Sequence, residues 1–336
     1  MLNQIETFWL QKSRVEAIRD GDRNTRFYHL STIVRRRVNR IEALQDVNGN
    51  WYLETEGVKH MVRDYVLRLY TDDNDQYRPY TLPSGRFPLL EPEVLHQIEA
   101  PFTATEVKTA IFEMGALKAP GPDGFQALFY QRFWDLIGSS LRDLVLGVLN
   151  GREFPEELNK TFIVLIPKID NPQSVTHLRP IGLCNVSYKT ITKVIVNQIK
   201  PLLAKLIAPT QCSFVPGRQI TDNVVIVQEV LHNMRRKQGN RGSMIIKLDL
   251  EKAYDCLRWP FVRETLLEAK IPQRLVEVIL NCVSTASFSI LWHGECTQGF
   301  IPTGGVRQGD PLSPYLFVLC MERLSHLIEE LVAAGA

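Results

Sequence analysis

The sequence lacks the features that mark a secreted, zinc-stabilised or membrane-spanning protein. Its six cysteines are scattered, with no Cys-x-x-Cys pair, which argues against a zinc module or disulfide framework and for a reducing compartment. No apolar run approaches the length of about 18 residues that a membrane span needs. The first residues show no basic start followed by an apolar stretch, so we expect no secretory signal. These absences predict an intracellular protein of the nucleus or cytoplasm, without a membrane partner.

The sequence also has no large excess of positive over negative charge. The 336 residues carry a formal net charge of only +2, so any nucleic-acid surface must be local. Residues 23–40 contain six arginines and no acidic residue, with Phe27 and Tyr28 among them. Arginines interleaved with aromatic rings suit a phosphate backbone with stacked bases, but a solvated helix face is an equally good explanation. The candidates for contacts with a nucleic-acid backbone are Arg35, Arg36, Arg37 and, in a later loop, Arg218.

Residues 71–92 are the best candidate for a linker. They contain three close aspartates, four prolines and little periodicity, which is typical of a connecting segment. Before them, residues 1–40 predict mainly helix, and residues 41–52 predict a β-hairpin turned at Asn48-Gly49. After them, Thr103 and Glu106 have the spacing of a capping box and predict the start of a helix.

A short apolar run precedes an acidic residue late in the chain. Residues 244–248 are rich in branched side chains and predict a largely buried strand. Asp249 follows where this strand should end, at the edge where open α/β sheets place their chemistry. The alternative is a structural one, in which Asp249 caps a helix that begins at Leu250.

Two further segments carry groups that suit phosphate or nucleotide binding. Residues 162–167 predict a buried strand, with Lys168 just beyond it and Arg179 after the next loop. Fixed cations suit a triphosphate, although ordinary charge at a strand edge is the alternative. Residues 303–314 contain three glycines, which let a backbone approach a ligand closely. Ser313 and Pro314 then predict the cap and first residue of a helix.

These motifs, in this order, resemble the reverse transcriptases of non-LTR (LINE-type) retrotransposons, of the plant-rich group. Asp249 followed by Ala253-Tyr254-Asp255 is similar to their first catalytic motif, and residues 118–124 (Lys-Ala-Pro-Gly-Pro-Asp-Gly) to the entry of their fingers. Residues 307–314 (Arg-Gln-Gly-Asp-Pro-Leu-Ser-Pro) look like the motif that holds the template and the incoming base. The region before Lys118 also resembles the segment that precedes the polymerase in these elements. The resemblance therefore covers almost the whole chain.

The resemblance implies a role for each matching residue. Asp249 would be catalytic and would hold Mg²⁺, and Tyr254 would lie under the incoming sugar and exclude a 2′-hydroxyl. Lys168 and Arg179 would clamp the triphosphate, and Gln308 would supply an amide contact to the nucleotide. The implied reaction is DNA synthesis from deoxynucleoside triphosphates on an RNA template and a DNA primer. The loop residues near the template would be Gly305, Arg307, Gly309 and Asp310.

The implied fold is α/β (α+β) and of the right-hand polymerase type. An N-terminal extension of helices and a hairpin would occupy residues 1–70, and a linker residues 71–92. The fingers would follow at residues 93–242, and a partial palm at residues 243–336.

One element of the motif set is not found in the sequence. Phosphoryl transfer by two metal ions needs oxygen ligands from more than one carboxylate. The family supplies the others from an Ala-Asp-Asp motif, whereas the sequence's Asp72-Asp73 pair lies in the linker. We therefore expect a chain truncated before that motif, with an incomplete magnesium site and no activity of its own. The alternatives are a non-catalytic nucleic-acid-binding remnant and a group II intron-type reverse transcriptase.

Overall fold

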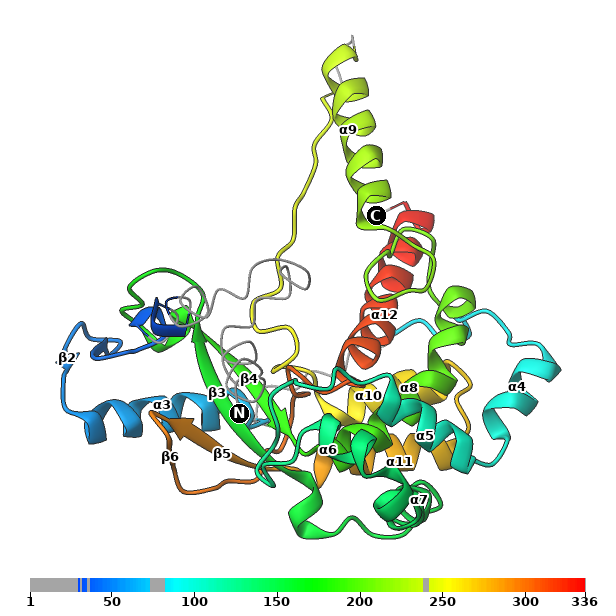
Figure 1. The fold of residues 1–336 in the computed structure, drawn as a ribbon. Helices are drawn as coiled ribbons and strands as arrows, with labels where there is room; N and C mark the ends of the chain where they lie inside the picture. The colour runs from blue at the N-terminus through cyan, green and yellow to red at the C-terminus, as the bar shows by residue number, and fades with distance from the viewer. Residues whose placement is uncertain (1–29, 31, 35–36, 73–81, 238–241, 336) are drawn as a thin grey trace.

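The computed structural model describes residues 30, 32–34, 37–72, 82–237 and 242–335 (Figure 1). In these ranges a mixed sheet lies beside a larger body of packed helices, so the predicted α/β class is confirmed. None of the helices there combines the length and apolarity needed to cross a bilayer.

The sheet is built around β3 (Lys160–Pro167), its central long strand. β3 pairs antiparallel with β4 (Leu178–Cys184) and parallel with β5 (Ser287–Trp292), in the order β4-β3-β5-β6. β5 turns back into β6 (Glu295–Cys296) through a turn at residues 293–294, where Gly294 has φ of 95°. The sheet thus joins strands from the segments predicted as fingers and as palm.

The N-terminal extension packs on one face of this sheet. Its hairpin pairs β1 (Leu44–Gln45) with β2 (Trp51–Tyr52) around a glycine at φ 84°, which confirms the predicted turn. Helix α3 (Thr55–Leu69) then places its valines at residues 58, 62 and 66 in one stripe. This stripe shares a buried cluster with residues of β3 and β5, so the extension and the sheet have a common core.

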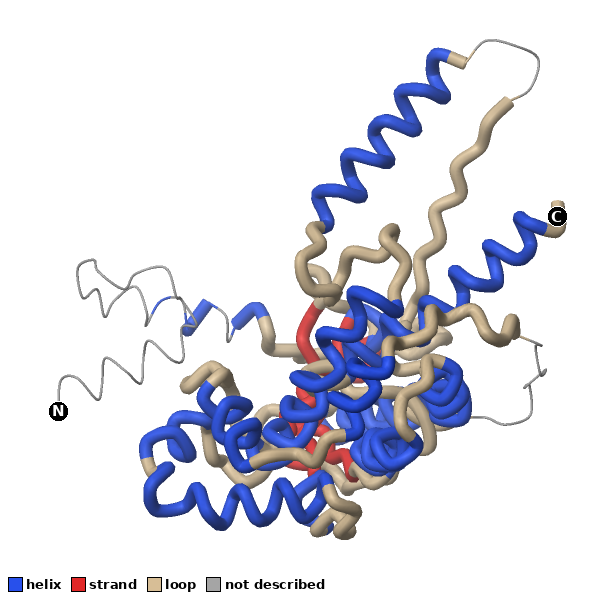
Figure 2. Tube along the Cα trace, turned by 90° about the vertical axis from the view of Figure 1, so that its right-hand side faces the viewer, coloured by secondary structure: helices blue, strands red, loops and turns tan. Residues whose placement is uncertain are grey.

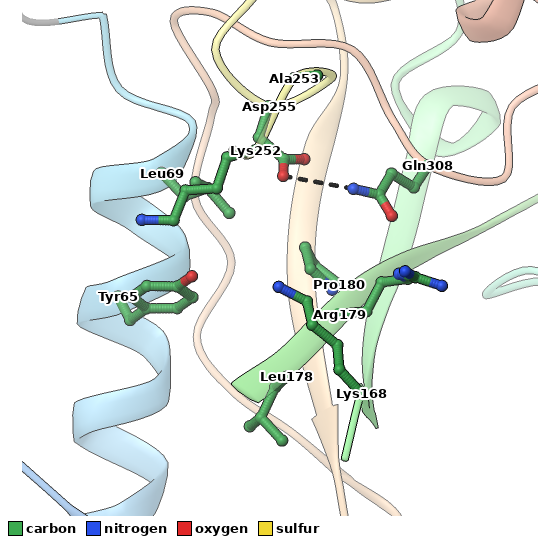
Figure 3. A pocket seen from close by; sticks show the side chains of 10 residues that line it. All are labelled: Tyr65, Leu69, Lys168, Leu178, Arg179, Pro180, Lys252, Ala253, Asp255 and Gln308. Atoms are coloured by element: carbon green, nitrogen blue, oxygen red, sulfur yellow. Dashed lines mark hydrogen bonds between the residues drawn. The ribbon is translucent and has the colours of Figure 1, made fainter. Parts of the chain in front are cut away.

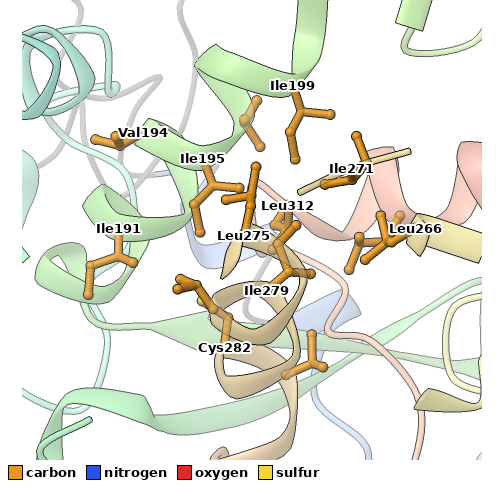
Figure 4. Packing of buried hydrophobic residues seen from close by; sticks show 14 of the residues in the cluster. Ile191, Val194, Ile195, Ile199, Leu266, Ile271, Leu275, Ile279, Cys282 and Leu312 are labelled. Atoms are coloured by element: carbon orange, nitrogen blue, oxygen red, sulfur yellow. The ribbon is translucent and has the colours of Figure 1, made fainter. Parts of the chain in front are cut away.

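The larger core is organised by α8 (Val186–Leu206), which follows β4 directly. Ile191, Ile195 and Ile199 recur every four residues on it and pack against Ile279 and its neighbours (Figure 4). The predicted capping box is present at Thr103 and opens α5 on this core. Further helices in the described residues are α4 (Pro92–Glu99), α5 (Ala104–Phe112), α6 (Ala127–Arg132), α7 (Trp134–Leu149), α9 (Ile220–Arg236), α10 (Trp259–Glu268), α11 (Gln273–Ser284) and α12 (Ser313–Ala333), with 3-10 turns at Glu156–Asn159 and Val175–His177.

The end of the segment predicted as a linker is packed against α12. The Phe87 ring meets His326 edge-on, with centroids 4.8 Å apart. The buried Arg323 donates a hydrogen bond of 2.8 Å to the Pro83 carbonyl. Residues 82–91 are therefore part of the helical body, although the predicted domain boundaries themselves remain a prediction.

The structure differs from the sequence-based prediction at the start of α12. Ser313 is the first residue of α12 rather than its cap, which is Leu312, and the Ser313 hydroxyl has no hydrogen-bond partner. The helix start is instead held from the loop, where Asp310 Oδ1 accepts the Leu312 N–H at 3.0 Å.

The strand predicted at residues 244–248 is not formed. These residues run extended and exposed, and in the described part of the chain no strand lies beside them to pair with their backbone. Helix α9, which precedes them, also buries none of its described residues. Figures 1 and 2 show this helix and residues 242–250 projecting together from the helical body. The prediction of a buried strand is wrong, because burial needs a partner surface that the described residues do not supply.

The contrast between α8 and α9 gives a stability prediction. Ile195→Ala should lower the free energy of unfolding by about 2–5 kcal/mol, because it leaves a cavity in a closed core. Val225→Ala on α9 is the matched control, since Val225 is 60% exposed and should change that free energy by only about 0.5 kcal/mol. Chemical denaturation of both variants measures the difference, and equal losses would contradict the packing described here.

Candidate nucleotide-binding site

A small pocket of about 140 Å³ lies where five segments meet (Figure 3). Helix α3 forms one wall, and the neighbouring ends of β3 and β4 form another. The turn at residues 251–256 and the glycine-rich loop at residues 303–312 close it from the other side. Its lining residues are Tyr65, Leu69, Lys168, Leu178, Arg179, Pro180, Lys252, Ala253, Asp255 and Gln308. Three of the predicted nucleotide contacts, at positions 168, 179 and 308, are among them.

The strand pairing explains why two of these contacts come together. Ile166 is opposite Arg179 in the antiparallel ladder, and Lys168 continues the ladder through its N–H to the His177 carbonyl at 2.8 Å. Lys168 and Arg179 are both exposed at this end of the sheet. The register of one hairpin therefore sets two cations at one mouth of the pocket.

A third cation, Lys252, faces the same pocket and was missed in the sequence. It adopts a left-handed backbone with φ of 54°, and its ammonium lies 5.3 Å from the centre of the Tyr65 ring. It belongs to the motif that starts at Asp249, so its place in that motif was the available signal. Three cations around a small opening suit a ligand that carries several negative charges.

Asp255 is the buried acid of the pocket. Its side chain accepts a hydrogen bond of 2.7 Å from the Tyr70 hydroxyl and one of 3.4 Å from Gln308 Nε2. Burial raises the pKa of Asp255 to about 6, because removal from water disfavours its charged form. Asp255 belongs to the first catalytic motif, but the resemblance gives it no role, and no sequence pattern points to Tyr70.

Tyr254 turns away from this pocket. Its ring is stacked on Phe317 of α12, with centroids 5.0 Å apart and an interplanar angle of 19°. Its carbonyl accepts the Val306 N–H at 2.9 Å, which ties the 251–256 turn to the glycine-rich loop. The predicted contact with the sugar of a nucleotide stays a prediction.

The side chains of Arg307 and Asp310 point into the protein. Arg307 is 2% exposed and donates to Asn159 Oδ1 at 2.6 Å and to Thr161 Oγ1 at 2.9 Å. Its guanidinium also pairs with Asp310, which in turn accepts the Tyr188 hydroxyl at 2.7 Å. Both residues were predicted to lie near the template, but this burial gives them a structural role in holding the loop.

The two predicted glycines allow the loop to approach its neighbours closely. Gly305 has φ of 78°, and a Cβ there would lie 2.5 Å from the Asp255 carbonyl oxygen. Gly309 has φ of 109°, and a Cβ there would lie 2.6 Å from the Gly182 carbonyl oxygen. Between them the Gln308 carbonyl accepts the Gly182 N–H at 2.6 Å. The side chain of Gln308 is thereby held over the pocket.

Asp249 stands apart from this site. It is exposed in the extended segment that follows α9. Within the ranges given above, no group of three or more His, Cys, Asp or Glu side chains could hold a metal ion. Reverse transcriptases generally use divalent metal ions, but the described residues do not fit such a site, and we derive no chemical step from one.

The predicted contacts with a nucleic-acid backbone lie far from one another in the chain. Arg218 was predicted to contact a nucleic-acid backbone, but its guanidinium donates to carbonyls at the end of α8, including that of Ile207 at 2.8 Å. These hydrogen bonds satisfy carbonyl groups that the end of a helix leaves unpaired. Arg37 is exposed beside a groove that Arg40 and Trp51 also line, and its role there stays a prediction. The positions 35 and 36 lie outside the described residues.

Comparison with known proteins decides the family. Residues 166–333, half of the chain, match the family model of the reverse transcriptase (RNA-dependent DNA polymerase). The chain belongs to the reverse transcriptase family. The matched region contains β4, β5, β6 and the glycine-rich loop of this reverse transcriptase domain, together with eight of the ten residues that line the pocket.

Similar proteins include those of non-LTR retrotransposons. The transposon TX1 uncharacterized 149 kDa protein of Xenopus laevis is 27% identical over 93% of this chain and 24% of its own length. The Pol polyprotein of the type-2 retrotransposable element R2DM of Drosophila melanogaster is 28% identical over 71% of this chain and 22% of its own. A 31-residue stretch, 9% of this chain, is 68% identical to a quarter of an uncharacterized mitochondrial protein of Arabidopsis thaliana. The chain thus spans less than a quarter of the two transposon proteins.

The burial of Arg307 gives a prediction that separates structural from binding arginines. Arg307→Ala should lower the free energy of unfolding by about 3–5 kcal/mol, because it leaves the buried Asp310 without its partner. The control Arg179→Ala, at an exposed position, should change it by only about 0.5 kcal/mol. Denaturation monitored by circular dichroism measures both, and an Arg307→Ala protein as stable as the control would contradict the structural role.

Proposed function

We propose that this chain forms the nucleotide-binding part of an RNA-directed DNA polymerase of a non-LTR retrotransposon. The observation that carries the proposal is the pocket that gathers Lys168, Arg179 and Gln308 from three separate segments. The family match supports it, and the names of the relatives favour a retrotransposon over a group II intron origin. The proposed ligand is a deoxynucleoside triphosphate, and the proposed macromolecular partners are an RNA template and a DNA primer.

The charges of the pocket suit this ligand. Lys168 and Arg179 would bind the triphosphate, with Arg179 offering a planar fork for two phosphate oxygens. Lys252 would add a third positive charge from the opposite wall. Gln308, held by its backbone on β4, would supply an amide to the nucleotide. In this arrangement the strand ends bind charge and the loop binds the polar edge of the ligand.

The proposed roles of Asp249 and Tyr254 come from the family resemblance. Asp249 would serve as a ligand of Mg²⁺, and Tyr254 as the residue that excludes a 2′-hydroxyl. Two-metal phosphoryl transfer needs further carboxylate oxygens around Asp249. These do not gather in the part of the chain that the structure describes.

Nucleotide binding is the direct test of the pocket. Lys168→Ala and Arg179→Ala should each weaken binding of deoxythymidine triphosphate by roughly tenfold or more, because each removes a charge-assisted contact. Lys160→Ala, at the other end of β3, is the matched control and should leave the affinity unchanged. Isothermal titration calorimetry measures all four proteins. Equal affinity in the wild type and both pocket variants would refute the assignment.

Primer extension tests the enzyme class. With an RNA template and a DNA primer, we expect the wild-type protein to leave the primer unextended, because the carboxylates that would complete a magnesium site at Asp249 do not gather in the described residues. Gel analysis of the labelled primer gives the result. Extension that is lost in Asp249→Ala and kept in Glu251→Ala, an exposed neighbour, would contradict this expectation. Binding of the template and primer without extension, unchanged in Asp249→Ala, would favour the alternative, a non-catalytic nucleic-acid-binding remnant.

A further inference from the structure

The N-terminal extension reaches the nucleotide pocket at the last turn of α3. Tyr65 and Leu69 of this helix line the pocket, and Tyr70 ends the helix directly behind it. No motif of the family resemblance includes these residues. The wall they form belongs to a segment outside the matched range of residues 166–333.

Tyr70 is held on all sides. It is 1% exposed, and its ring meets Phe288 of β5 edge-on, with centroids 5.0 Å apart. Its carbonyl accepts the N–H groups of Thr303 and Gly304 at 2.9 and 3.2 Å. The residue therefore joins α3 to the sheet and to the start of the glycine-rich loop.

The hydroxyl of Tyr70 continues this connection into the pocket. It donates to Asp255 Oδ1 at 2.7 Å, while Asp255 Oδ2 accepts Gln308 Nε2 at 3.4 Å. Figure 3 shows the amide nitrogen of Gln308 turned toward Asp255 and the amide oxygen turned away from it. An ionised carboxylate only accepts hydrogen bonds, so it orients that amide with nitrogen inward.

We propose that Tyr70 is a positioning residue of the nucleotide site. It holds the Asp255 carboxylate, and Asp255 in turn sets the orientation of the Gln308 amide that contacts the nucleotide. The inference rests on the proposed function of the pocket. It adds that the N-terminal extension, and not the matched domain alone, determines how the site binds its ligand.

The surroundings of Asp255 make the Tyr70 hydroxyl important. Burial raises the pKa of Asp255, and the hydrogen bonds from Tyr70 and Gln308 lower it, as do the positive charges on the pocket rim. Loss of the Tyr70 hydroxyl should therefore move this pKa upward from about 6. The charged and titratable groups around Asp255 are Tyr65 and Tyr70 of α3, Lys168 beyond β3, Lys252 and Cys256 of the turn, and Arg307, whose charge acts on Tyr70.

The test uses Tyr70→Phe, which keeps the packed ring and removes only the hydroxyl. Carboxyl ¹³C NMR of the aspartate-labelled chain follows the titration of Asp255, assigned with Asp255→Asn. Tyr70→Phe should raise the midpoint, and the control Tyr52→Phe, on the exposed hairpin strand β2, should leave it in place. Thermal unfolding of the same samples shows that each variant is folded.

The effect on the ligand is measured at about pH 8, where Asp255 is largely ionised in both proteins. Tyr70→Phe should weaken binding of deoxythymidine triphosphate by roughly fivefold or more, a typical coupling between linked sites. In a Gln308→Leu background the same change should weaken it by less than about twofold, because the amide it acts through is gone. A purely structural role would instead weaken binding equally in both backgrounds.

The outcomes separate the inference from the function on which it rests. If Lys168→Ala weakens binding while Tyr70→Phe leaves both the titration and the affinity unchanged, the inference is wrong and the proposed function stands. Equal losses in the two Gln308 backgrounds also overturn the inference. A wild-type chain that does not bind the nucleotide overturns the proposed function itself.

Discussion

The buried ion pair between Arg307 and Asp310 is the interaction on which the site most depends. Burying a charge is costly unless it is paired and hydrogen-bonded, and here the guanidinium reaches Asn159, Thr161 and its partner acid. The pair holds the loop against Thr161 of β3 and the Cys282 carbonyl of α11, and Gln308 lies between the two charges. The same Arg-Gln-Gly-Asp sequence thus supplies both the buried ion pair and Gln308, the residue that this ion pair holds at the pocket.

The N-terminal extension is integral to the structure around the site. Its helix α3 shares a core with β3 and β5, and its last residue, Tyr70, contacts the sheet, the loop and the acid of the pocket. Asp72, two residues later, accepts a hydrogen bond of 2.7 Å from Arg258 at the start of α10. Removing the extension would therefore uncover the core of the sheet and open one wall of the pocket.

The projecting segment formed by α9 and residues 242–250 shows the limit of a local pattern. A short segment rich in apolar residues needs both a covering surface and a neighbouring strand to become a buried strand. In the described residues Ile245 and Ile246 have neither, and they lie extended and exposed. The position of Asp249 follows directly from this, because it continues the same segment.

Local sequence was enough to determine several elements. Asn48-Gly49 determined a hairpin, and Thr103 with Glu106 determined a capped helix. The motifs also determined the family and three of the pocket residues. These features depend on neighbours in the chain, whose backbone preferences and periodicity the sequence states directly.

Tertiary structure decided which residues far apart in the sequence meet at the site. The meeting of Tyr70 with Asp255, 185 residues apart, depends on the packing of α3 on the sheet, which no local pattern contains. The inward direction of Arg307 and the stacking of Tyr254 on α12 were decided in the same way. Sequence determined which chemical groups the chain carries, and long-range packing determined which of them face a ligand and which hold the protein together.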